Sequence, residues 1–336
     1  MPEPPQRPGS LWIRLTLGAL LVILASASAT AVAAFHEVDR LAGAFGGRLE
    51  LGGGLAEADA GKPQTVLIIG SDKRARTAQD ARLGLEVNSD TMILARLDPS
   101  KKATALMSLP RDLKVRIPGH GTDKLNAAYA LGGPRLTLET IKQLTGLRIN
   151  HVINVDFGGF RKAVDAIGCV YVDIDRRYFN ARTGPGGYAA IDVPPGYQRL
   201  CGEKALQYVR HRHTDNDLVR SARQQDFLRQ AKQQLGVGRL IADRAELVEI
   251  FGRYTESDIK GNAEVLRLLK LVIASAGHPI REVHFEGRIG GKYVTVGYDQ
   301  IEELISQFLG VEETQGPRGT VEPRRRRRSR RPPPLR

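Results

Sequence analysis

The chain has 336 residues, 41% of them hydrophobic and 26% charged, so its composition permits a packed globular core. Its formal net charge of +13 would suit a nucleic-acid binder, but residues 311–336 alone contain nine arginines and three glutamates. Because the rest of the chain carries no zinc-finger or RNA-recognition signature, we expect no nucleic-acid partner.

The N-terminal part of the chain contains 21 consecutive residues without a charge, from Leu15 to Phe35. As a helix this stretch would be about 31 Å long, which matches the hydrocarbon core of a bilayer. Two arginines precede it, so the positive-inside rule predicts a cytoplasmic segment over 1–14, a transmembrane helix over 15–35 and an extracytoplasmic remainder. A cleaved signal peptide is the alternative, since small residues fill 25–34. Both alternatives export the domain.

Residues 36–62 are rich in glycine and alanine and are expected to form a linker. We expect the folded domain over 63–310 and a disordered Arg/Pro-rich tail over 311–336. The tail either binds anionic wall polymer or lipid headgroups, or has no partner. The chain has two cysteines, Cys169 and Cys201, and an oxidising exterior would allow them to form a disulfide.

Apolar runs and amphipathic segments alternate between residues 63 and 310. The expected strands are 65–70, 91–97, 103–109, 152–155, 170–174, 282–285 and 293–296. The expected helices are 125–131, 136–144, 157–167, 203–209, 220–235, 243–276 and 298–309. Residues 176–200 are expected to form a long loop, either a functional lid or an insertion. This alternation predicts an α/β domain with three layers, α-β-α, and a mixed central sheet.

The stretch from Tyr208 to Gln225 concentrates charge next to an apolar helical pattern. Its charged and titratable residues are Arg210, His211, Arg212, His213, Asp215, Asp217, Arg220 and Arg223. A helix would place Arg220, Arg223 and Gln224 on one face, whereas Arg210 and Arg212 would point to opposite sides. We therefore expect the backbone to leave the helix near Arg210.

Guanidinium groups aimed at one place repel each other unless an anion lies between them, and arginine forks match phosphate oxygens. The stretch therefore suggests an anion site, although a solvated basic helix face is the alternative. The two histidines could transfer protons, or they could only pack against the arginines.

Acidic and basic residues also follow or precede several predicted strands. Asp72, Asp90 and Asp112 lie at strand ends, where open α/β sheets bind ligands, and carboxylates with room for water suit Mg²⁺. Taken alone, each aspartate could equally form a turn or cap a helix. Arg74, Arg111 and Lys124 occupy similar positions, and metal with guanidinium groups around phosphate is typical of phosphoryl transfer. Lone residues of this kind are often surface charges, and the chain has no Walker A loop, kinase signature or Gly-x-Ser-x-Gly motif.

Six short motifs occur in order along the chain. They are Gly70-Ser71-Asp72 with Arg74, Ser89-Asp90-Thr91-Met92, Ser108-Leu109-Pro110-Arg111-Asp112, Lys124 to Tyr129, Tyr208 to Arg212, and Arg220 to Gln225. Their order and spacing resemble those of the LytR-CpsA-Psr cell-envelope proteins, and the stretch 154–173 resembles the central strand–helix–strand of that family. The resemblance is strong over 63–236 and looser up to about 310.

The resemblance implies a phosphotransferase anchored in the cell membrane, with its catalytic domain outside. The donor would be a glycan on a polyprenyl pyrophosphate, the acceptor a peptidoglycan hydroxyl, and the cofactor Mg²⁺ on Asp72 and Asp90. The implied catalytic residues are Arg111, Asp112, Arg210 and Arg212. The implied pyrophosphate ligands are Arg74, Arg111, Lys124, Arg210, Arg212, Arg220, Arg223 and Gln224. Asp112 is a candidate base or, more simply, an ion-pair partner that orients Arg111.

The chain departs from the family pattern in two places. Asn88 stands where the family usually has arginine, so a phosphate contact is missing unless Arg82 supplies it. Cys169 and Cys201 stand where glycine and asparagine are common, which favours a disulfide between them over two unrelated small buried residues. The first departure keeps a second hypothesis open, a non-catalytic module that holds a polyprenyl phosphate or an anionic polymer. Transcriptional regulation is a third, and export of the domain argues against it.

Overall fold

The computed structural model describes residues 47–57, 59, 61–71, 89–101, 103–181, 191–211, 217–234, 238, 249, 255–259 and 261–310. Its centre is a seven-stranded sheet in the order β1-β12-β7-β2-β3-β4-β13. The strands are β1 (Gly47–Arg48), β2 (Gln64–Ser71), β3 (Ser89–Asp98), β4 (Ala103–Ser108), β7 (His151–Asp156), β12 (Thr255–Ser257) and β13 (Ile280–Val283). β2 runs antiparallel to β3 and parallel to β7, so the sheet is mixed, as predicted.

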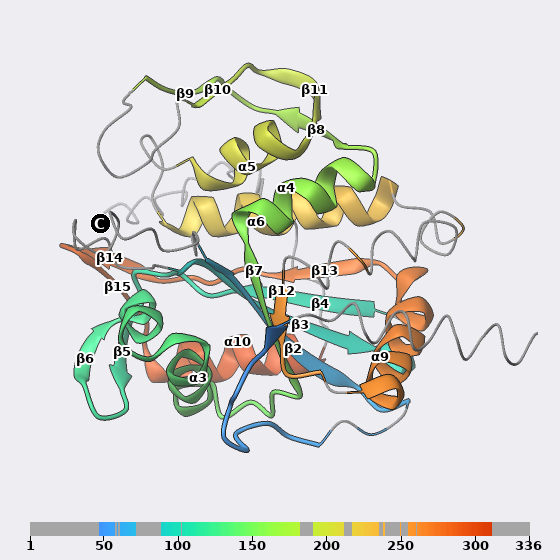
Figure 1. Cartoon of the computed structure of the whole chain (residues 1–336). Coiled ribbons are helices and arrows are strands. Elements are labelled where there is room, and N and C mark those ends of the chain that lie inside the picture. Colours follow the sequence, from blue (N-terminus) through green and yellow to red (C-terminus); the bar gives the residue numbers. More distant parts are fainter. Residues whose placement is uncertain are drawn as a thin grey trace, which may run out of the picture.

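Helices cover both faces of this sheet, which confirms the three-layer prediction (Figure 1). They are α3 (Leu125–Thr145), α4 (Phe157–Ala166), α5 (Gly202–Arg210), α6 (Asp217–Gln234), α9 (Gly261–Ala276) and α10 (Tyr298–Gly310). α3 and α10 lie on one face, and α6 lies on the other with α4 and α5 beyond it. α9 packs against β3 and the short helix η1 (Pro99–Lys101).

The apolar strands explain this layering. Side chains alternate across a strand, so a continuous apolar run supplies both faces of a sheet. Leu67 and Ile69 of β2 join the core under α3 and α10, whereas Ile68 joins a smaller cluster with Leu228 of α6. α3 is kinked at Gly132 and Gly133, which have non-helical backbone angles, so its two halves match the two predicted helices.

Four short strands form a two-part ribbon; one of them was predicted over 170–174, and the other three lie where the sequence predicted a loop over 176–200. They are β8 (Val170–Ile174), β9 (Tyr178–Asn180), β10 (Ile191–Val193) and β11 (Gly196–Leu200), and β8 pairs with β11 while β9 pairs with β10. Their inward side chains form a second core with α4, α5 and α6. The loop prediction was wrong because strands of three to five residues give too short an alternation to detect beside glycine and proline.

Two further boundaries differ from the predictions. β12 lies inside the range 243–276, which was predicted to be helical throughout. The fold also begins before Pro63, because β1 pairs with β12 and both Leu49 and Leu51 are buried in the main core. The end of the predicted linker is therefore part of the domain.

Four short strands lie at the periphery, three of which were not predicted. They are β5 (Lys114–Ile117), β6 (Gly121–Lys124), β14 (Arg288–Gly290) and the predicted β15 (Tyr293–Thr295). The predicted transmembrane helix over 15–35 and the tail over 311–336 lie outside the described residues. Among the residues that are described, no helix has the length and apolar character to cross a membrane.

Candidate active site

The strand β3 begins with an irregularity that sets the position of Asp90. Ser89 pairs with Ser71 and Thr91 with Gly70, so Asp90 is the additional residue at a shift in the register. Such bulges redirect a side chain and often lie near active sites. The Asp90 carboxylate accepts a hydrogen bond from Arg111 Nη1 at 2.5 Å and lies 3.6 Å from Arg210 Nη2. The bulge thus brings together two arginines that are 99 positions apart in the sequence (111 and 210).

Arg111 lies among three carboxylates just beyond the end of β4. Besides Asp90, its Nε atom lies 3.9 Å from Asp217 and 4.0 Å from Asp112. Asp112 has a closer partner, because Lys124 Nζ donates to it at 2.8 Å. The predicted pair between Asp112 and Arg111 is therefore the weaker of the two contacts, and Lys124 is what holds Asp112.

Arg210 is the last residue of α5. The helix ends there because His211 adopts an extended conformation, as expected from the spacing of Arg210 and Arg212. The Arg210 guanidinium lies 4.0 Å from the ring centroid of Phe157, the first residue of α4, which is the geometry of a cation–π contact. Phe157 is not among the predicted site residues, since an aromatic residue at a helix start gives no functional signal.

Asp217, at the start of α6, is the second site residue with no role predicted from the sequence. It accepts a hydrogen bond from Arg220 one turn later, and only 2% of the Arg220 side chain is exposed. It also accepts a hydrogen bond from the Asp112 backbone N–H at 3.4 Å. The i,i+3 spacing of Asp217 and Arg220 could have indicated this pair.

Arg223 and Gln224 hold helix α5 in place. Arg223 Nη1 donates to the carbonyls of Tyr208 and His211 at 3.2 and 3.0 Å. Gln224 Nε2 donates to Thr91 Oγ1 at 2.8 Å and to the Val209 carbonyl at 3.3 Å. These contacts fix the C-terminus of α5 against α6 and β3. The predicted role of both residues as pyrophosphate ligands stays a prediction.

The cluster of Asp90, Arg111, Asp112, Lys124, Arg210, Asp217 and Arg220 is hereafter the arginine–aspartate cluster. Four of its members are basic and three acidic, so carboxylates of the chain itself separate the guanidinium groups. This corrects the expectation that like-charge repulsion alone demands an external anion.

Unsatisfied polar atoms supply a better reason to expect a ligand. Within the described part of the chain, Arg111 Nε, Arg210 Nε, Ser71 Oγ and Ser89 Oγ are buried and have no hydrogen-bond partner. Buried polar groups in folded proteins are nearly always hydrogen-bonded. The two N–H groups suit an anionic oxygen, and the two hydroxyls beside Asp90 suit a ligand or a hard cation.

Several predicted site residues belong to segments outside the described part of the chain. Asp72, Arg74 and Arg212, together with Arg82 and Asn88, lie outside the described residues. Their assigned roles stay predictions. His211 is fully buried, and its ring packs edge-on against Tyr178 at 5.1 Å, which supports packing over proton transfer.

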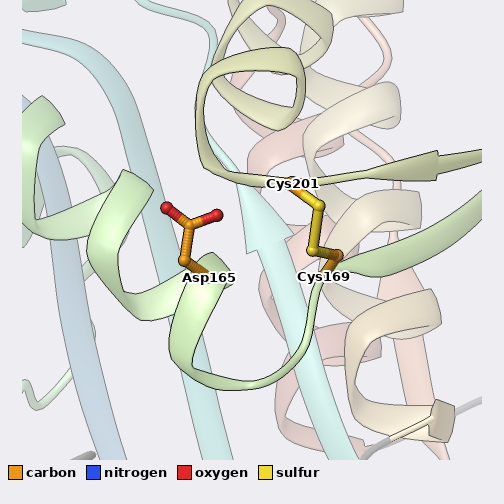
Figure 2. Close-up of side chains that lie close together, drawn as sticks. All are labelled: Asp165, Cys169 and Cys201. Carbon is orange, nitrogen blue, oxygen red and sulfur yellow. A yellow bond between two sulfur atoms is a disulfide. The ribbon is translucent and has the colours of Figure 1, made fainter.

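The predicted disulfide between Cys169 and Cys201 is present, with a Cα–Cα distance of 4.4 Å. Figure 2 shows it where the end of α4 meets the start of α5, with Asp165 beside it. Asp165 also accepts a hydrogen bond from the Gly202 backbone N–H at 2.8 Å. α4 and α5 are thus joined by the disulfide at one end and by Phe157 and Arg210 at the other, which fixes where Arg210 lies.

A second ionic group lies on α6, away from the cluster. Arg229 Nε donates to Glu282 of β13 at 2.9 Å, and Arg229 also pairs with Asp226. His284 Nε2 lies 3.6 Å from the other Glu282 oxygen. Burial raises the pKa of Glu282 to about 7, although Arg229 opposes the shift.

This raised pKa predicts a measurable loss of stability with rising pH. A carboxyl whose pKa is higher in the folded state stabilises the protein below its unfolded value of 4.5, and that contribution is lost as the pH rises through about 7. We expect urea unfolding to show a loss on the order of 3 kcal/mol across this window, and Glu282→Gln to remove it. Because the His284 ring lies 3.6 Å from Glu282, both proteins should also be measured with His284→Gln. If the free energy of unfolding changes equally with pH in the unaltered protein and in Glu282→Gln, the raised pKa of Glu282 is contradicted.

One pocket of the described residues lies at the other end of the sheet. It has a volume of about 540 Å³ and contains His151, Asp258, Glu57 and Glu264 in its wall. Asp258 is held by His151 Nδ1 at 3.0 Å and by the Val152 N–H at 2.6 Å. No predicted site residue lines this pocket, so it is separate from the arginine–aspartate cluster.

A known family and several known proteins are similar to this chain in sequence. The LytR_cpsA_psr family matches residues 33–308. The chain is 31% identical over 262 residues to the polyisoprenyl-teichoic acid–peptidoglycan teichoic acid transferase TagU of Oceanobacillus iheyensis, covering 74% of this chain and 76% of that protein. It is 36% identical over 169 residues to LcpB of Corynebacterium glutamicum, a probable cell wall biosynthesis protein, covering 48% of this chain and 39% of that one.

Solved structures share the fold. Protein gbs0355 from Streptococcus agalactiae superposes with a TM-score of 0.63 at 24% identity, covering 76% of this chain and 90% of that one. YwtF (TagT) with bound octaprenyl pyrophosphate lipid has a TM-score of 0.52 at 20% identity, covering 76% and 92%. At these identities the structural likeness establishes the fold.

Proposed function

Because the chain belongs to the LytR_cpsA_psr family, we propose that it is a membrane-anchored phosphotransferase that moves a phosphate-linked glycopolymer from a polyprenyl pyrophosphate carrier to a peptidoglycan hydroxyl. Relatives named as teichoic acid transferases support this reaction class, as does a family structure with a bound lipid pyrophosphate. The observation that carries the proposal is that Arg111 and Arg210 meet at Asp90 while each keeps an unsatisfied, buried Nε.

Arg111, Arg210 and Asp90 suit the following reaction. The acceptor oxygen forms a bond to the phosphorus that carries the glycan, the phosphorus–oxygen bond of the pyrophosphate bridge breaks, and polyprenyl phosphate leaves. Arg111 and Arg210 would donate to the pyrophosphate oxygens and stabilise the charge that develops on the leaving phosphate. Asp90, Asp112 and Asp217 hold the basic side chains in position before the substrate binds.

The proton of the acceptor hydroxyl has no assigned base among the described residues. Asp112 accepts from Lys124 at 2.8 Å, and this favours a positioning role for it over proton abstraction. Asp90 would share a Mg²⁺ ion with Asp72, since a carboxylate has lone pairs beyond those used by two arginines and the Ser71 and Ser89 hydroxyls lie next to it. Such an ion would neutralise charge on the pyrophosphate.

A direct assay tests the proposal. Purified full-length protein in detergent, given a glycan-bearing polyprenyl pyrophosphate, Mg²⁺ and peptidoglycan, should release polyprenyl phosphate, and a chelator should reduce this release at least tenfold. Adding Mg²⁺ back should restore it. If the protein instead retains the intact lipid without cleaving it, the non-catalytic binding hypothesis replaces this one. Release that is unaffected by the chelator would refute the role of the metal.

A further inference from the structure

The outer face of the ribbon formed by β8, β9, β10 and β11 carries three exposed aromatic rings. Tyr171 is 42% exposed, Phe179 51% and Tyr197 72%. β8, β9 and β10 alternate strictly, so their other side chains are buried against α4, α5 and α6, whereas in β11 only Leu200 is buried. In Figure 1 this ribbon is the outermost layer at the top of the molecule, and no described element lies over it.

The rings are held in fixed orientations. Tyr171 and Tyr197 stack with centroids 5.6 Å apart and planes 17° apart. The backbone of Tyr171 is fixed from below, because the Gln234 side chain of α6 both accepts from its N–H and donates to its carbonyl at 2.7 Å. One face of Phe179 is covered by the Arg177 guanidinium at 4.8 Å, and Arg177 is itself anchored to Asp192 by two hydrogen bonds.

The polar residues among the rings define the chemistry of this face. Asp173 lies opposite Tyr197 and Arg199 opposite Tyr171, and Asp192 lies opposite Phe179. With Arg177, the described residues of this face supply two carboxylates and two guanidinium groups, so their charges balance. A balanced face gives no advantage to a polyanion or an anionic membrane. Flat rings beside carboxylates and guanidinium groups instead suit a saccharide, whose C–H faces stack on rings and whose hydroxyls donate to carboxylates.

The ribbon is continuous with the arginine–aspartate cluster through its inner face. Tyr178, the neighbour of Phe179 on β9, contacts the rings of Tyr208 and His211 at 5.4 and 5.1 Å. His211 directly follows Arg210 at the end of α5, and Tyr208 lies two residues before it. Phe179 is therefore at the cluster end of the ribbon. Tyr171 lies eight residues before it on β8, beyond the bend at 175–176.

We infer that this face binds the glycan of the donor as it extends from the pyrophosphate, with Phe179 nearest the reacting phosphorus and the Tyr171–Tyr197 pair further out. The inference rests on the proposed function and adds a saccharide subsite to it. A donor glycan starts at the pyrophosphate, so a ribbon whose β9 end packs on the Arg210 end of α5, and whose β8 end lies further away, matches its course. We therefore assign this face to the donor glycan and not to the peptidoglycan acceptor.

The test compares two donors on the same polyprenyl pyrophosphate, one with a disaccharide and one with a glycan of many repeats. For the full-length Tyr171→Ala/Tyr197→Ala protein, we expect the KM of the long donor to rise about tenfold, with kcat and the disaccharide KM unchanged. Tyr171→Phe/Tyr197→Phe keeps both rings and should behave as the unaltered protein. Tyr298→Ala is a matched control, because Tyr298 is 75% exposed on α10, away from the ribbon.

Each other outcome overturns the inference. If the KM of the long donor is unchanged, the saccharide subsite is refuted. The proposed function is still supported in that case, because the protein transfers the glycan. A rise in the KM of peptidoglycan alone would make the face an acceptor site. Loss of binding to vesicles of anionic phospholipid by the alanine variant, with donor KM unchanged, would make it a membrane contact. Absence of transfer in the unaltered protein would refute the proposed function, and binding of the free long glycan, measured by calorimetry, would then decide the subsite separately.

Discussion

Replacing Arg111 with alanine is expected to lower kcat/KM for transfer by at least about a thousandfold while leaving the protein folded. Arg111 donates to Asp90 at 2.5 Å and keeps a buried Nε without a hydrogen-bond partner among the described residues. It is thus the guanidinium best placed to bind a pyrophosphate oxygen beside Asp90. Asp90 and Asp112 are 17% and 20% exposed, so water can solvate the carboxylates that the substitution leaves behind.

Two further variants separate charge from geometry at this position. Arg111→Lys keeps the positive charge but loses the planar fork, so we expect it to recover only a small part of the activity. Arg135→Ala removes an exposed arginine that pairs with Glu139 on α3, and it should be neutral. Release of polyprenyl phosphate measures activity, and circular dichroism checks the fold. An Arg111→Ala protein that is folded and fully active would refute the proposed site.

The buried pair of Arg220 and Asp217 gives the second large effect, and here the expected loss is stability. Their side chains are only 2% and 5% exposed. Removing Arg220 leaves the buried Asp217 carboxylate with the longer contacts to Arg111 Nε at 3.9 Å and the Asp112 N–H at 3.4 Å, and breaking a buried pair in this way costs about 3–5 kcal/mol. We therefore expect Arg220→Ala to unfold at much lower urea concentration than the unaltered protein. Arg111→Ala should show no comparable shift.

A double substitution tests whether Arg220 also has a role in the reaction. Arg220→Met with Asp217→Asn removes both charges and keeps similar volumes, so most of the lost stability should return. If Arg220 contributes to the substrate site, this stable protein will still be defective in transfer. A double variant that is stable and fully active would limit Arg220 to a structural role. A single variant as stable as the unaltered protein would contradict the burial argument.

The sequence predicted the layers of the domain better than its edges. β2, β3 and β4 are long apolar runs, so periodicity alone revealed them. β12 has three residues, and it is a strand only because β1 and β7 lie on either side of it. Nothing local marks such a segment, since its hydrogen bonds come from residues about 100 and 200 positions away. The same reason explains the undetected strands of the ribbon.

The residue types of the site could also be predicted from the sequence, but the partners of each residue could not. Arginines and aspartates at strand and helix ends indicated an ionic site, and Arg111, Arg210 and Asp90 do meet. The pairings of Asp112 with Lys124 and of Arg210 with Phe157 depend on where α4, α5 and β6 pack. Arg223 illustrates the limit, because helical spacing placed it with Arg220 while folding directed it to carbonyls at the end of α5.

By itself, the sequence determined the family, the order of the main strands and helices, and the residue types that gather in the site, because motifs and periodicity are local properties of a chain. Only the tertiary structure decided which carboxylate neutralises which guanidinium, since ion pairs depend on distances between elements that are remote in sequence. It also decided that the region predicted as a loop joins β8 in a ribbon with three aromatic rings on its outer face, because short strands exist only where a partner strand and a core support them.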